Sequence, residues 1–318
     1  MENVDEGERE PQAADAVLMI RPEAFSGNPQ TAGSNFFQSG ETGAVAQIAA
    51  AARGEAAALA FALAAAGVRV HVFDGRRKDA LPDEVFPNNW LSLHADGTAV
   101  LFPLLAPNRR RERRPELIAA LRDELGYRIA RIVDLTHLER PGMFLEGTGS
   151  LVLDRPRRVA YACLSPRTHP EALAEFGRTL GYETVPFDAV DRAGRSIYHT
   201  NVMLALGTGF AALCTAAVAD PAQRRRLAAR LEASGREIVD LTFDQLHAFA
   251  GNLLELRGGG GRSVIVLSAT ALASLGRAQI RRLESYGELL GVEIGTIERY
   301  GGGSVRCMLA EVAAPRNA

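Results

Sequence analysis

Short apolar runs alternate with longer amphipathic stretches along most of the chain. The apolar runs are bounded by Gly, Pro, Asn and Asp, which is typical of buried β-strands flanked by turns. Between 90 and 102, for example, two apolar runs are separated by an Asp-Gly turn, which is a strong hairpin signal. The longer stretches, such as 44–66, have the pattern of amphipathic helices. The pattern therefore predicts an α/β fold built from hairpins and helices.

These elements recur in a fixed order of strand, strand, helix and strand. Hairpins begin near residues 90, 150, 202 and 253, so the spacings are 60, 52 and 51 residues, and such a period predicts an array of similar units. The predicted elements are strands 90–93 and 98–102, helix 114–125 and strand 132–135; strands 150–153 and 159–164, helix 170–180 and strand 184–187; strands 202–206 and 210–214, helix 221–233 and strand 238–241; strands 253–256 and 263–267, helix 277–290 and strand 292–295.

The two ends of the chain complete this arrangement. The first unit has strand 17–20, helix 44–66 and strand 68–73 but lacks a hairpin, whereas 305–312 is a spare apolar strand at the far end. Pairing of that strand with the first unit would close the array into a ring and remove an exposed sheet edge. Two doubly wound halves or an open solenoid are the alternatives, and the leftover terminal strands favour the ring.

A long polar loop, 23–39, follows the first strand and is rich in Gly, Asn, Pro and Ser. A long irregular stretch in a compact domain is often a lid or a binding loop. Asn28 and Asn35 lie in this loop, and turn-forming roles explain them at least as well as contacts with a ligand do.

Composition narrows the classes of function. The 318-residue chain has 47% hydrophobic residues and a formal net charge of −2, so no overall charge favours nucleic acid or an anionic membrane. Its cysteines, Cys163, Cys214 and Cys307, show no CxxC spacing, which argues against a disulfide framework or a zinc site and suits a reducing cytosol. We predict a cytoplasmic protein that uses no metal or other cofactor and binds neither nucleic acid nor membrane; the oligomeric state is left open.

The chain is expected to form one large domain. Residues 1–14 are acidic and polar and predict a disordered tail, 15–314 a single domain, and 315–318 a second short tail. The alanine-rich helix 44–66 is interrupted by Gln, Arg and Glu, so it is interpreted as an amphipathic helix rather than a membrane span.

In a ring of such units, the residues just before each hairpin would face one central channel. A cysteine, a histidine, a carboxylate and several amides around a common cavity are the composition of a site for nucleophilic acyl or amidino transfer. The residues at these positions are Asn89, Glu146, His199, Asn201, Asn252 and Cys307.

Three of these residues have predicted chemical roles. Cys307 would attack as a thiolate, and His199 would pass protons as general acid and base. Glu146 would accept hydrogen bonds from substrate N–H groups, because an ionised carboxylate only accepts. A small core cysteine, a hydrogen-bonded core histidine and a turn residue are the structural alternatives. Asn252 is set aside as a turn cap.

Several motifs carry a resemblance to a known family. They are MIRPEAFSGNPQTAGSNFFQ, FPNNW, FLEGTGSLVLD, CLSPRT, IYHTN, AGNLLEL and GGGSVRC. In this order, between 17 and 312, they resemble the guanidino-group-modifying enzymes of the pentein superfamily, most closely the citrulline-utilisation hydrolases, which are related to arginine deiminases and dimethylarginine hydrolases. The resemblance implies five ββαβ units around a pseudo-fivefold axis and a hydrolase of carbon–nitrogen bonds in a small amino-acid substrate.

The resemblance also implies roles for individual residues. Cys307 matches the family nucleophile, His199 the histidine of its HxD motif, and Glu146 the acid of its EGGD-like motif. Arg109 and Arg167 match positions that contact the substrate α-carboxylate in dimethylarginine hydrolases, a task suited to bidentate arginine. For Arg109, a solvated basic turn is an equally good interpretation.

Two departures from the wider family bear on the substrate. Asn89 in FPNNW and Asn201 in HTN stand where arginine-processing members have aspartates, and an amide cannot neutralise a guanidinium. A ureido group is neutral and has a carbonyl acceptor, which asparagine can serve. We therefore expect Asn89 and Asn201 to bind citrulline, with ornithine, ammonia and carbon dioxide as products. Arginine deimination, dimethylarginine hydrolysis, amidino transfer and a non-catalytic binding pentein are the alternatives.

Overall fold

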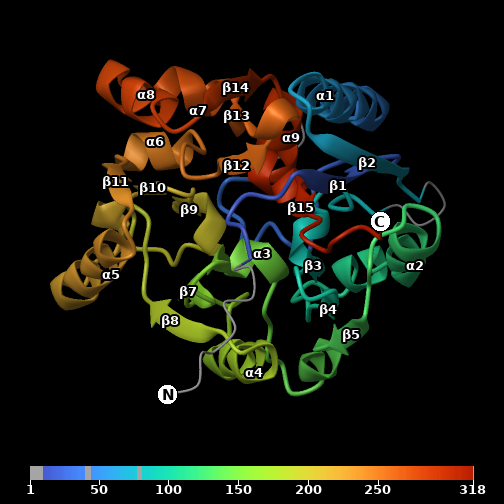
Figure 1. Cartoon of the computed structure of the whole chain (residues 1–318), viewed down its shortest axis with the longest axis horizontal. Coiled ribbons are helices and arrows are strands. Elements are labelled where there is room, and N and C mark those ends of the chain that lie inside the picture. Colours follow the sequence, from blue (N-terminus) through green and yellow to red (C-terminus); the bar gives the residue numbers. More distant parts are fainter. Residues whose placement is uncertain (1–9, 40–43, 77–80, 318) are drawn as a thin grey trace.

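The computed structural model describes residues 10–39, 44–76 and 81–317. Within this part of the chain, five three-stranded sheets surround a common axis (Figure 1). Four of the sheets contain an antiparallel hairpin whose second strand pairs in parallel with the strand that follows a helix. The predicted α/β class and the ring of ββαβ units are confirmed, and the two alternative arrangements of the units are wrong.

The first sheet joins the two ends of the chain. It contains β1 (Ala16–Arg21), β2 (Arg69–Asp74) and β15 (Ala310–Glu311), and helix α1 (Val45–Ala65) connects β1 to β2. β15 pairs antiparallel with β1, so the terminal strand closes the ring as the sequence predicts. This strand is shorter than predicted, however, because residues 305–308 form a 3₁₀ turn instead of extended chain.

The other four units share one order of elements, to which some of them add short helices. The second and third units contain β3 (Leu91–Leu93), β4 (Thr98–Leu101), α2 (Pro115–Asp123) and β5 (Arg131–Asp134); then α3 (Gly147–Ser150), β6 (Val152–Asp154), β7 (Val159–Cys163), α4 (Pro170–Leu180) and β8 (Glu183–Phe187). The fourth and fifth contain β9 (Leu204–Leu206), β10 (Phe210–Leu213), α5 (Pro221–Ala233) and β11 (Glu237–Asp240); then α6 (Phe243–His247), β12 (Leu254–Arg257), β13 (Ser263–Ser268), α7 (Ala269–Ser274), α8 (Arg277–Glu284), β14 (Glu288–Val292) and α9 (Gly295–Gly301).

The prediction for the end of the fifth unit is wrong in register. Helix α8 ends at Glu284, and β14 begins at Glu288, within the predicted helix. Leu289 and Leu290 pair with Ile265 and Val266 of β13. These two leucines therefore belong to a β-strand and not to the apolar face of the predicted helix. The following residues, which were predicted as a strand, turn into α9 instead.

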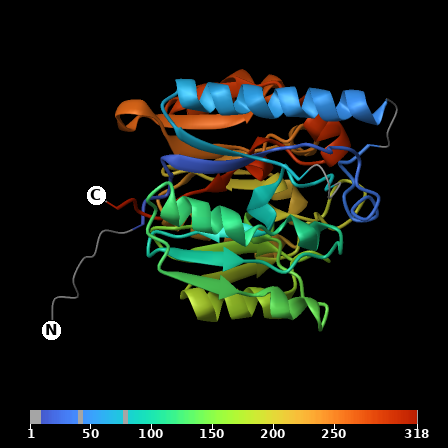
Figure 2. The same ribbon diagram turned by 90° about the vertical axis from the view of Figure 1, so that its right-hand side faces the viewer.

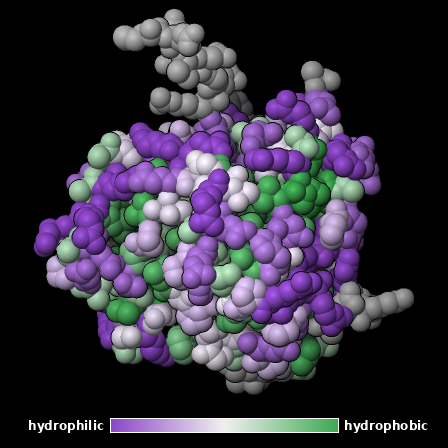
Figure 3. Space-filling view, turned by 90° about the horizontal axis from the view of Figure 1, so that it is seen from below, coloured by the Kyte–Doolittle hydropathy of each residue, from purple (hydrophilic) through white to green (hydrophobic). Residues whose placement is uncertain are grey.

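Helix α4 illustrates how the outer helices form. His169 caps its first turn by accepting a hydrogen bond from the Glu171 N–H, and Gly181 ends it in the left-handed region at φ 68°. Leu173 and Phe176 are buried on its inner side. The surface seen from below Figure 1, where α4 lies, is covered largely by hydrophilic residues with smaller apolar patches (Figure 3).

Helix α1 is the one helix of the described residues that is long and apolar enough to cross a membrane, judged by length and composition alone. Those two properties do not separate a membrane span from a helix of a folded domain. One face of α1, including Ile48, Leu59 and Leu63, is buried in a cluster with residues of β1, α9 and the 3₁₀ turn at 305–308.

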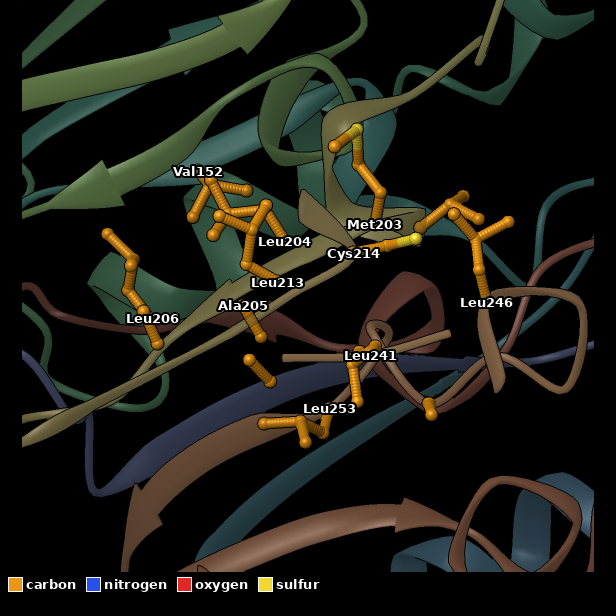
Figure 4. Close-up of a cluster of buried hydrophobic side chains, with 14 of the residues drawn as sticks. Val152, Met203, Leu204, Ala205, Leu206, Leu213, Cys214, Leu241, Leu246 and Leu253 are labelled. Atoms are coloured by element: carbon orange, nitrogen blue, oxygen red, sulfur yellow. The ribbon is translucent and has the colours of Figure 1, made fainter. Parts of the chain in front are cut away.

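The hydrophobic core is divided among the units rather than concentrated at the axis. Its largest cluster joins the third, fourth and fifth units, and Figure 4 shows residues of β9 and β10 interlocking with Val152, Leu241 and Leu253. Cys214 lies within this cluster and Cys163 is equally buried, so both are structural, as predicted.

The two ends of the described chain are ordered where the sequence predicts tails. Residues 1–9 and 318 lie outside the described residues. Glu10 pairs with Arg155 at 2.6 Å, Gln12 donates to the Leu153 carbonyl, and the Arg128 N–H donates to the Pro315 carbonyl. In this structure residues at both ends therefore contact the folded domain where the sequence predicts tails, and the domain boundaries stay a prediction. These ends lie on one side of the ring, and loop 22–39 lies on the other (Figure 2).

Candidate active site

Short turns around the ring axis position the polar residues. Asn89 ends the 3₁₀ turn Pro87–Asn89, Glu146 precedes α3, and His199 precedes the 3₁₀ turn Thr200–Val202. Cys307 lies in the turn Val305–Met308. Each turn leads into an inner strand of its sheet, so the repeat brings residues from distant parts of the chain together. Cys307, His199 and Glu146 are only 4%, 2% and 1% exposed.

The sulfur of Cys307 is contacted by two amides. Asn252 Nδ2 lies 3.3 Å and Asn201 Nδ2 3.5 Å from Sγ. Burial raises the pKa of the Cys307 thiol, and these amide donors and the nearby Arg306 oppose that rise. Asn252, which the sequence analysis sets aside as a turn cap, therefore belongs to the site. Its position in the repeat, just before an inner strand, was the signal that could have identified it.

His199 and Glu146 form a buried hydrogen-bonded pair. His199 Nε2 lies 2.8 Å from Glu146 Oε2. Burial lowers the pKa of His199 to about 4, although the hydrogen bond and charge of Glu146 act in the opposite direction. The histidine is therefore neutral at pH 7. Because the carboxylate only accepts, Nε2 carries the proton and Nδ1 is left as an acceptor.

Glu146 is occupied by protein groups rather than left free for a substrate. Burial alone would raise its pKa, but Arg167 and His199 outweigh that effect and hold the pKa well below its usual range. Arg167 lies 3.4 Å from Oε2, and the Leu105 N–H donates to Oε1 at 3.0 Å. In this structure the contact between Glu146 and His199 orients the histidine ring. This role of Glu146 differs from the predicted one, in which it accepts hydrogen bonds from substrate N–H groups.

A single small pocket brings most of the predicted residues together. Its volume is about 10 Å³, little more than the space for one water molecule. The lining residues are Asn35, Asp83, Phe86, Asn89, Arg109, Arg167, Tyr198, His199, Gly301, Gly302, Gly303 and Cys307. Entry of an amino acid would therefore require the surrounding loops to move.

The loop predicted as a lid lies over this pocket. Asn35 Nδ2 donates to the Gly301 carbonyl at 3.0 Å, and Asn28 Nδ2 donates to Asp83 Oδ2 at 2.7 Å. Arg167 donates to Ser34 Oγ of the same loop at 2.8 Å. The two asparagines thus tie the loop to the pocket wall, in addition to forming turns.

Arg109 is buried and fully engaged, so it is not a solvated basic turn. Its guanidinium binds Glu112 through two nitrogens and donates to Asn89 Oδ1 at 2.8 Å. Burial raises the pKa of Glu112 to about 8, although Arg109 lowers it. Asp83 lies 3.6 Å from the same guanidinium. Because of these partners, Arg109 is less available for a substrate carboxylate than predicted.

Two polar atoms of the pocket residues have no partner. The donor Asn89 Nδ2 and the acceptor Asp83 Oδ1 are both buried and unbonded. A Cβ on Gly149 would lie 2.4 Å from Asn89 Nδ2 and 2.8 Å from the His199 ring, so only glycine fits between these groups. Asp83 was missed because a lone aspartate in a loop has no distinguishing sequence pattern.

Asn201 is not among the residues that line the pocket. Its Nδ2 contacts the cysteine sulfur, and its Oδ1 has no partner. Asn201 lines instead a second cavity, of about 30 Å³, together with Arg155, Arg306 and Glu311. In this structure Asn201 therefore contacts the sulfur of Cys307, and its contact with a substrate stays a prediction.

Comparison with known proteins gives a family match and several similar structures. Residues 21–314 match the family model of eukaryotic N,N dimethylarginine dimethylhydrolase. No curated protein matches the sequence.

The similar solved structures share the fold at low sequence identity. Unliganded ArgZ, an arginine dihydrolase from the ornithine–ammonia cycle in cyanobacteria, has a TM-score of 0.69 and 18% identity over 95% of this chain, which spans only 41% of ArgZ. The N-terminal domain of ArgZ bound to substrate has the same TM-score and identity over 94% of this chain and 98% of that domain. A dimethylarginine dimethylaminohydrolase adduct has a TM-score of 0.62 and 16% identity over 93% of this chain and 99% of that one.

Proposed function

From the premise that the chain belongs to the N,N dimethylarginine dimethylhydrolase family of the pentein superfamily, we propose that it is a cysteine-dependent hydrolase that converts citrulline to ornithine, ammonia and carbon dioxide. One observation carries the proposal. Cys307 and His199 line the same pocket as an unpartnered amide donor, Asn89 Nδ2.

The proposed reaction proceeds through a covalent adduct. The neutral His199 takes the proton of Cys307, and the thiolate attacks the ureido carbon. A carbon–nitrogen bond then breaks as the imidazolium returns a proton to the departing nitrogen. Water attacks the carbonyl carbon of the thioester-like adduct, His199 accepts its proton, and the carbon–sulfur bond breaks. The carbamic acid released in this way then breaks its remaining carbon–nitrogen bond as its acid proton passes to the nitrogen. Carbon dioxide leaves without a second water, so one water is consumed overall.

Glu146 supports this proton transfer without touching the substrate. Its carboxylate accepts from His199 Nε2–H and stabilises the imidazolium that forms during the reaction. The ArgZ domain solved with a covalently bound reaction intermediate is consistent with an adduct on this fold.

The free groups of the pocket favour a neutral reacting group. Asn89 Oδ1 is already bound by Arg109, so this side chain offers only N–H donors, which suit the ureido oxygen of citrulline. Asp83 Oδ1 would accept from the α-ammonium group. Arg167 would bind the α-carboxylate once loop 22–39 opens and releases its contact with Ser34.

Arginine is the second candidate substrate, and a specific observation favours it. Asp83 Oδ1 is an unpartnered carboxylate oxygen in the pocket, and a guanidinium could donate to it. ArgZ is also an arginine dihydrolase. Dimethylarginine, the substrate in the name of the matching family, would use the same carboxylate.

Turnover by the purified protein tests the proposal. Citrulline, arginine and asymmetric dimethylarginine are supplied at equal concentration, and ornithine, citrulline, ammonia and dimethylamine are measured, with Cys307→Ala as the control for contaminating activity. We expect the highest kcat/KM with citrulline. Turnover of arginine without turnover of citrulline would replace the proposed substrate by the second candidate. If none of the three is hydrolysed, the pocket serves binding rather than catalysis.

A further inference from the structure

Asn252 lies on the fifth unit, between α6 and β12, and is completely buried. Its side chain makes three contacts at the ring axis. Nδ2 donates to the backbone carbonyl of Asn201 at 2.8 Å and to Cys307 Sγ at 3.3 Å, and Oδ1 accepts from the Arg306 N–H at 3.0 Å. The same amide thus contacts the sulfur of Cys307 and the backbone of two turns, the one that contains Asn201 and the one that contains Arg306 and Cys307.

The two backbone contacts fix which way this amide points. A carbonyl oxygen only accepts and a backbone N–H only donates, so the NH₂ group must face Asn201 and the oxygen must face Arg306. One hydrogen of the NH₂ group then remains, and it is directed at the sulfur. The orientation therefore does not depend on the protonation state of Cys307.

Asn201 supplies a second donor from the opposite side. Its Nδ2 contacts Sγ, while its Oδ1 belongs to a residue that lines the 30 Å³ cavity with Arg155 and Arg306. Among the described residues no donor reaches that oxygen, so the contact with Sγ is the one hydrogen bond of the Asn201 side-chain amide.

The contacts favour the anionic form of the sulfur. A protonated thiol can donate to Asn252 Oδ1 at 3.7 Å, but this oxygen already accepts from Arg306. A thiolate, in contrast, accepts from two amide N–H groups, and hydrogen bonds to a charged group are about twice as strong as neutral ones.

We propose that Asn252, together with Asn201, stabilises the thiolate that Cys307 Sγ becomes when His199 takes its proton, and keeps it in the attacking position, so that Asn252 is a residue of the catalytic machinery. The proposal rests on Cys307 being the nucleophile of the proposed function. It assigns to the fifth unit a role in catalysis, where the sequence suggests only a turn.

The test measures the thiolate of Cys307 directly, without any substrate. Ultraviolet thiolate absorbance is followed between about pH 7 and pH 11, because burial raises the pKa of the Cys307 thiol. The trace of a Cys307→Ser variant is subtracted, which removes the contributions of Cys163 and Cys214, whose pKa values burial raises to about 12 and about 11.

Three variants of Asn252 are compared with the wild-type protein. Asn252→Ala and Asn252→Ser should raise the titration midpoint of Cys307 by about one pH unit, because a donor to the charged sulfur is lost. Asn252→Asp keeps the acceptor for Arg306 but places a carboxylate beside the sulfur, so it should raise the midpoint further. The rate at which iodoacetamide alkylates Cys307 at neutral pH should fall about tenfold or more, because a rise of one pH unit in the midpoint lowers the thiolate fraction about tenfold.

Asn88→Ala is the matched control, because Asn88 is another fully buried asparagine near the site and has no contact with the sulfur. Its midpoint should stay within about 0.3 pH units of wild type. Unchanged midpoints in folded Asn252 variants would overturn the proposal. Failure of all three variants to fold would also overturn it, because the role of Asn252 would then be to stabilise the fold and not to stabilise the thiolate. Since no substrate is used, a normal titration shift without turnover would count against the proposed function only.

Discussion

At the end of the ring axis that holds Cys307, buried polar atoms without partners lie on residues in or next to a pocket, whereas at the opposite end most buried charged groups are joined in ion pairs. The unpartnered atoms near the cysteine belong to Asp83, Asn88 and Asn89. Leaving such a group unsatisfied costs about 1–3 kcal/mol. Because Asp83 and Asn89 line the pocket, the stability given up by their unpaired atoms is lost in a place where a ligand can recover it.

The opposite end is closed by a network of ion pairs. Arg306 binds Glu311 at 2.7 Å, Arg155 contacts both Glu311 and Glu10, and Arg236 binds Asp154 at 2.6 Å. Of these five side chains and that of Glu10, only Asp154 has an oxygen without a partner. The network joins Glu10, which precedes the first strand, and the last strand, β15, to the third and fourth units.

The difference separates two tasks within one fold. Both ends are buried and both contain charges, so burial and charge alone do not distinguish a catalytic end from a structural one. What distinguishes them is unused hydrogen-bonding capacity beside a nucleophile. Substitutions at the cysteine end should therefore change activity, and substitutions at the opposite end should change stability.

Replacement of the nucleophile should give the largest effect. In Cys307→Ala we expect kcat/KM to fall by at least about 10⁴-fold, because no covalent adduct can form. The melting temperature should change by no more than a few degrees, because the substitution removes a single sulfur atom at the edge of the apolar cluster that includes the 305–308 turn. Ornithine release and thermal unfolding measured on the same sample check both parts. Retained activity would remove Cys307 from the mechanism.

At the opposite end, Glu311→Gln should destabilise the protein by about 3–5 kcal/mol, because it leaves two buried arginines without a shared carboxylate. Denaturant titration measures the free energy of unfolding. Glu293→Gln, at an exposed glutamate, is the control and should change that free energy by less than about 0.5 kcal/mol. Activity per folded molecule should change by less than about threefold. A large loss of activity without loss of stability would contradict the division between the two ends.

The sharpest test of the cysteine end is its selectivity. Asn89→Asp adds a carboxylate beside Arg109 and His199, so it should raise the kcat/KM ratio of arginine to citrulline by about 10–100-fold. Competition between the two substrates in one reaction measures the ratio directly. Asn108→Asp, on a loop asparagine that contacts Asn28 rather than the reacting groups, is the matched control and should leave the ratio unchanged. If both variants shift it equally, the net charge of the region and not Asn89 sets selectivity.

The sequence predicts two features well: the ring of units, and the turns before the inner strands that bring polar residues to the ring axis. Both follow from a repeat that hydrophobic periodicity reveals. It predicts Cys307, His199 and Glu146 as neighbours for the same reason. It fails where partners decide a role. Asn252 resembles a turn cap, because no local pattern shows which buried groups it meets.

Two buried histidines extend the comparison to pH. His199 has a carboxylate partner, whereas the His94 ring is hydrogen-bonded to the Ser92 hydroxyl at 2.9 Å, packs against Phe176 and Tyr182, and lies near Arg155. Burial lowers the pKa of His94 to about 3, and the charge of Arg155 adds to this effect. In the unfolded chain the pKa returns to about 6.5.

The smallest expected effect follows from His94. Because its pKa is lower in the folded state, the unfolded state binds the extra proton between about pH 6.5 and pH 3, and stability is lost as the pH falls through that window. Between about pH 7 and pH 5.5 this loss should be about 1 kcal/mol for one group. His94→Gln should reduce the difference in unfolding free energy between these two pH values by that amount, measured by denaturant titration, with His169→Gln on a partly exposed helix cap as the control. An unchanged pH dependence would mean that His94 is already protonated in the folded protein, and that the end of the axis near Arg155 accommodates an additional positive charge.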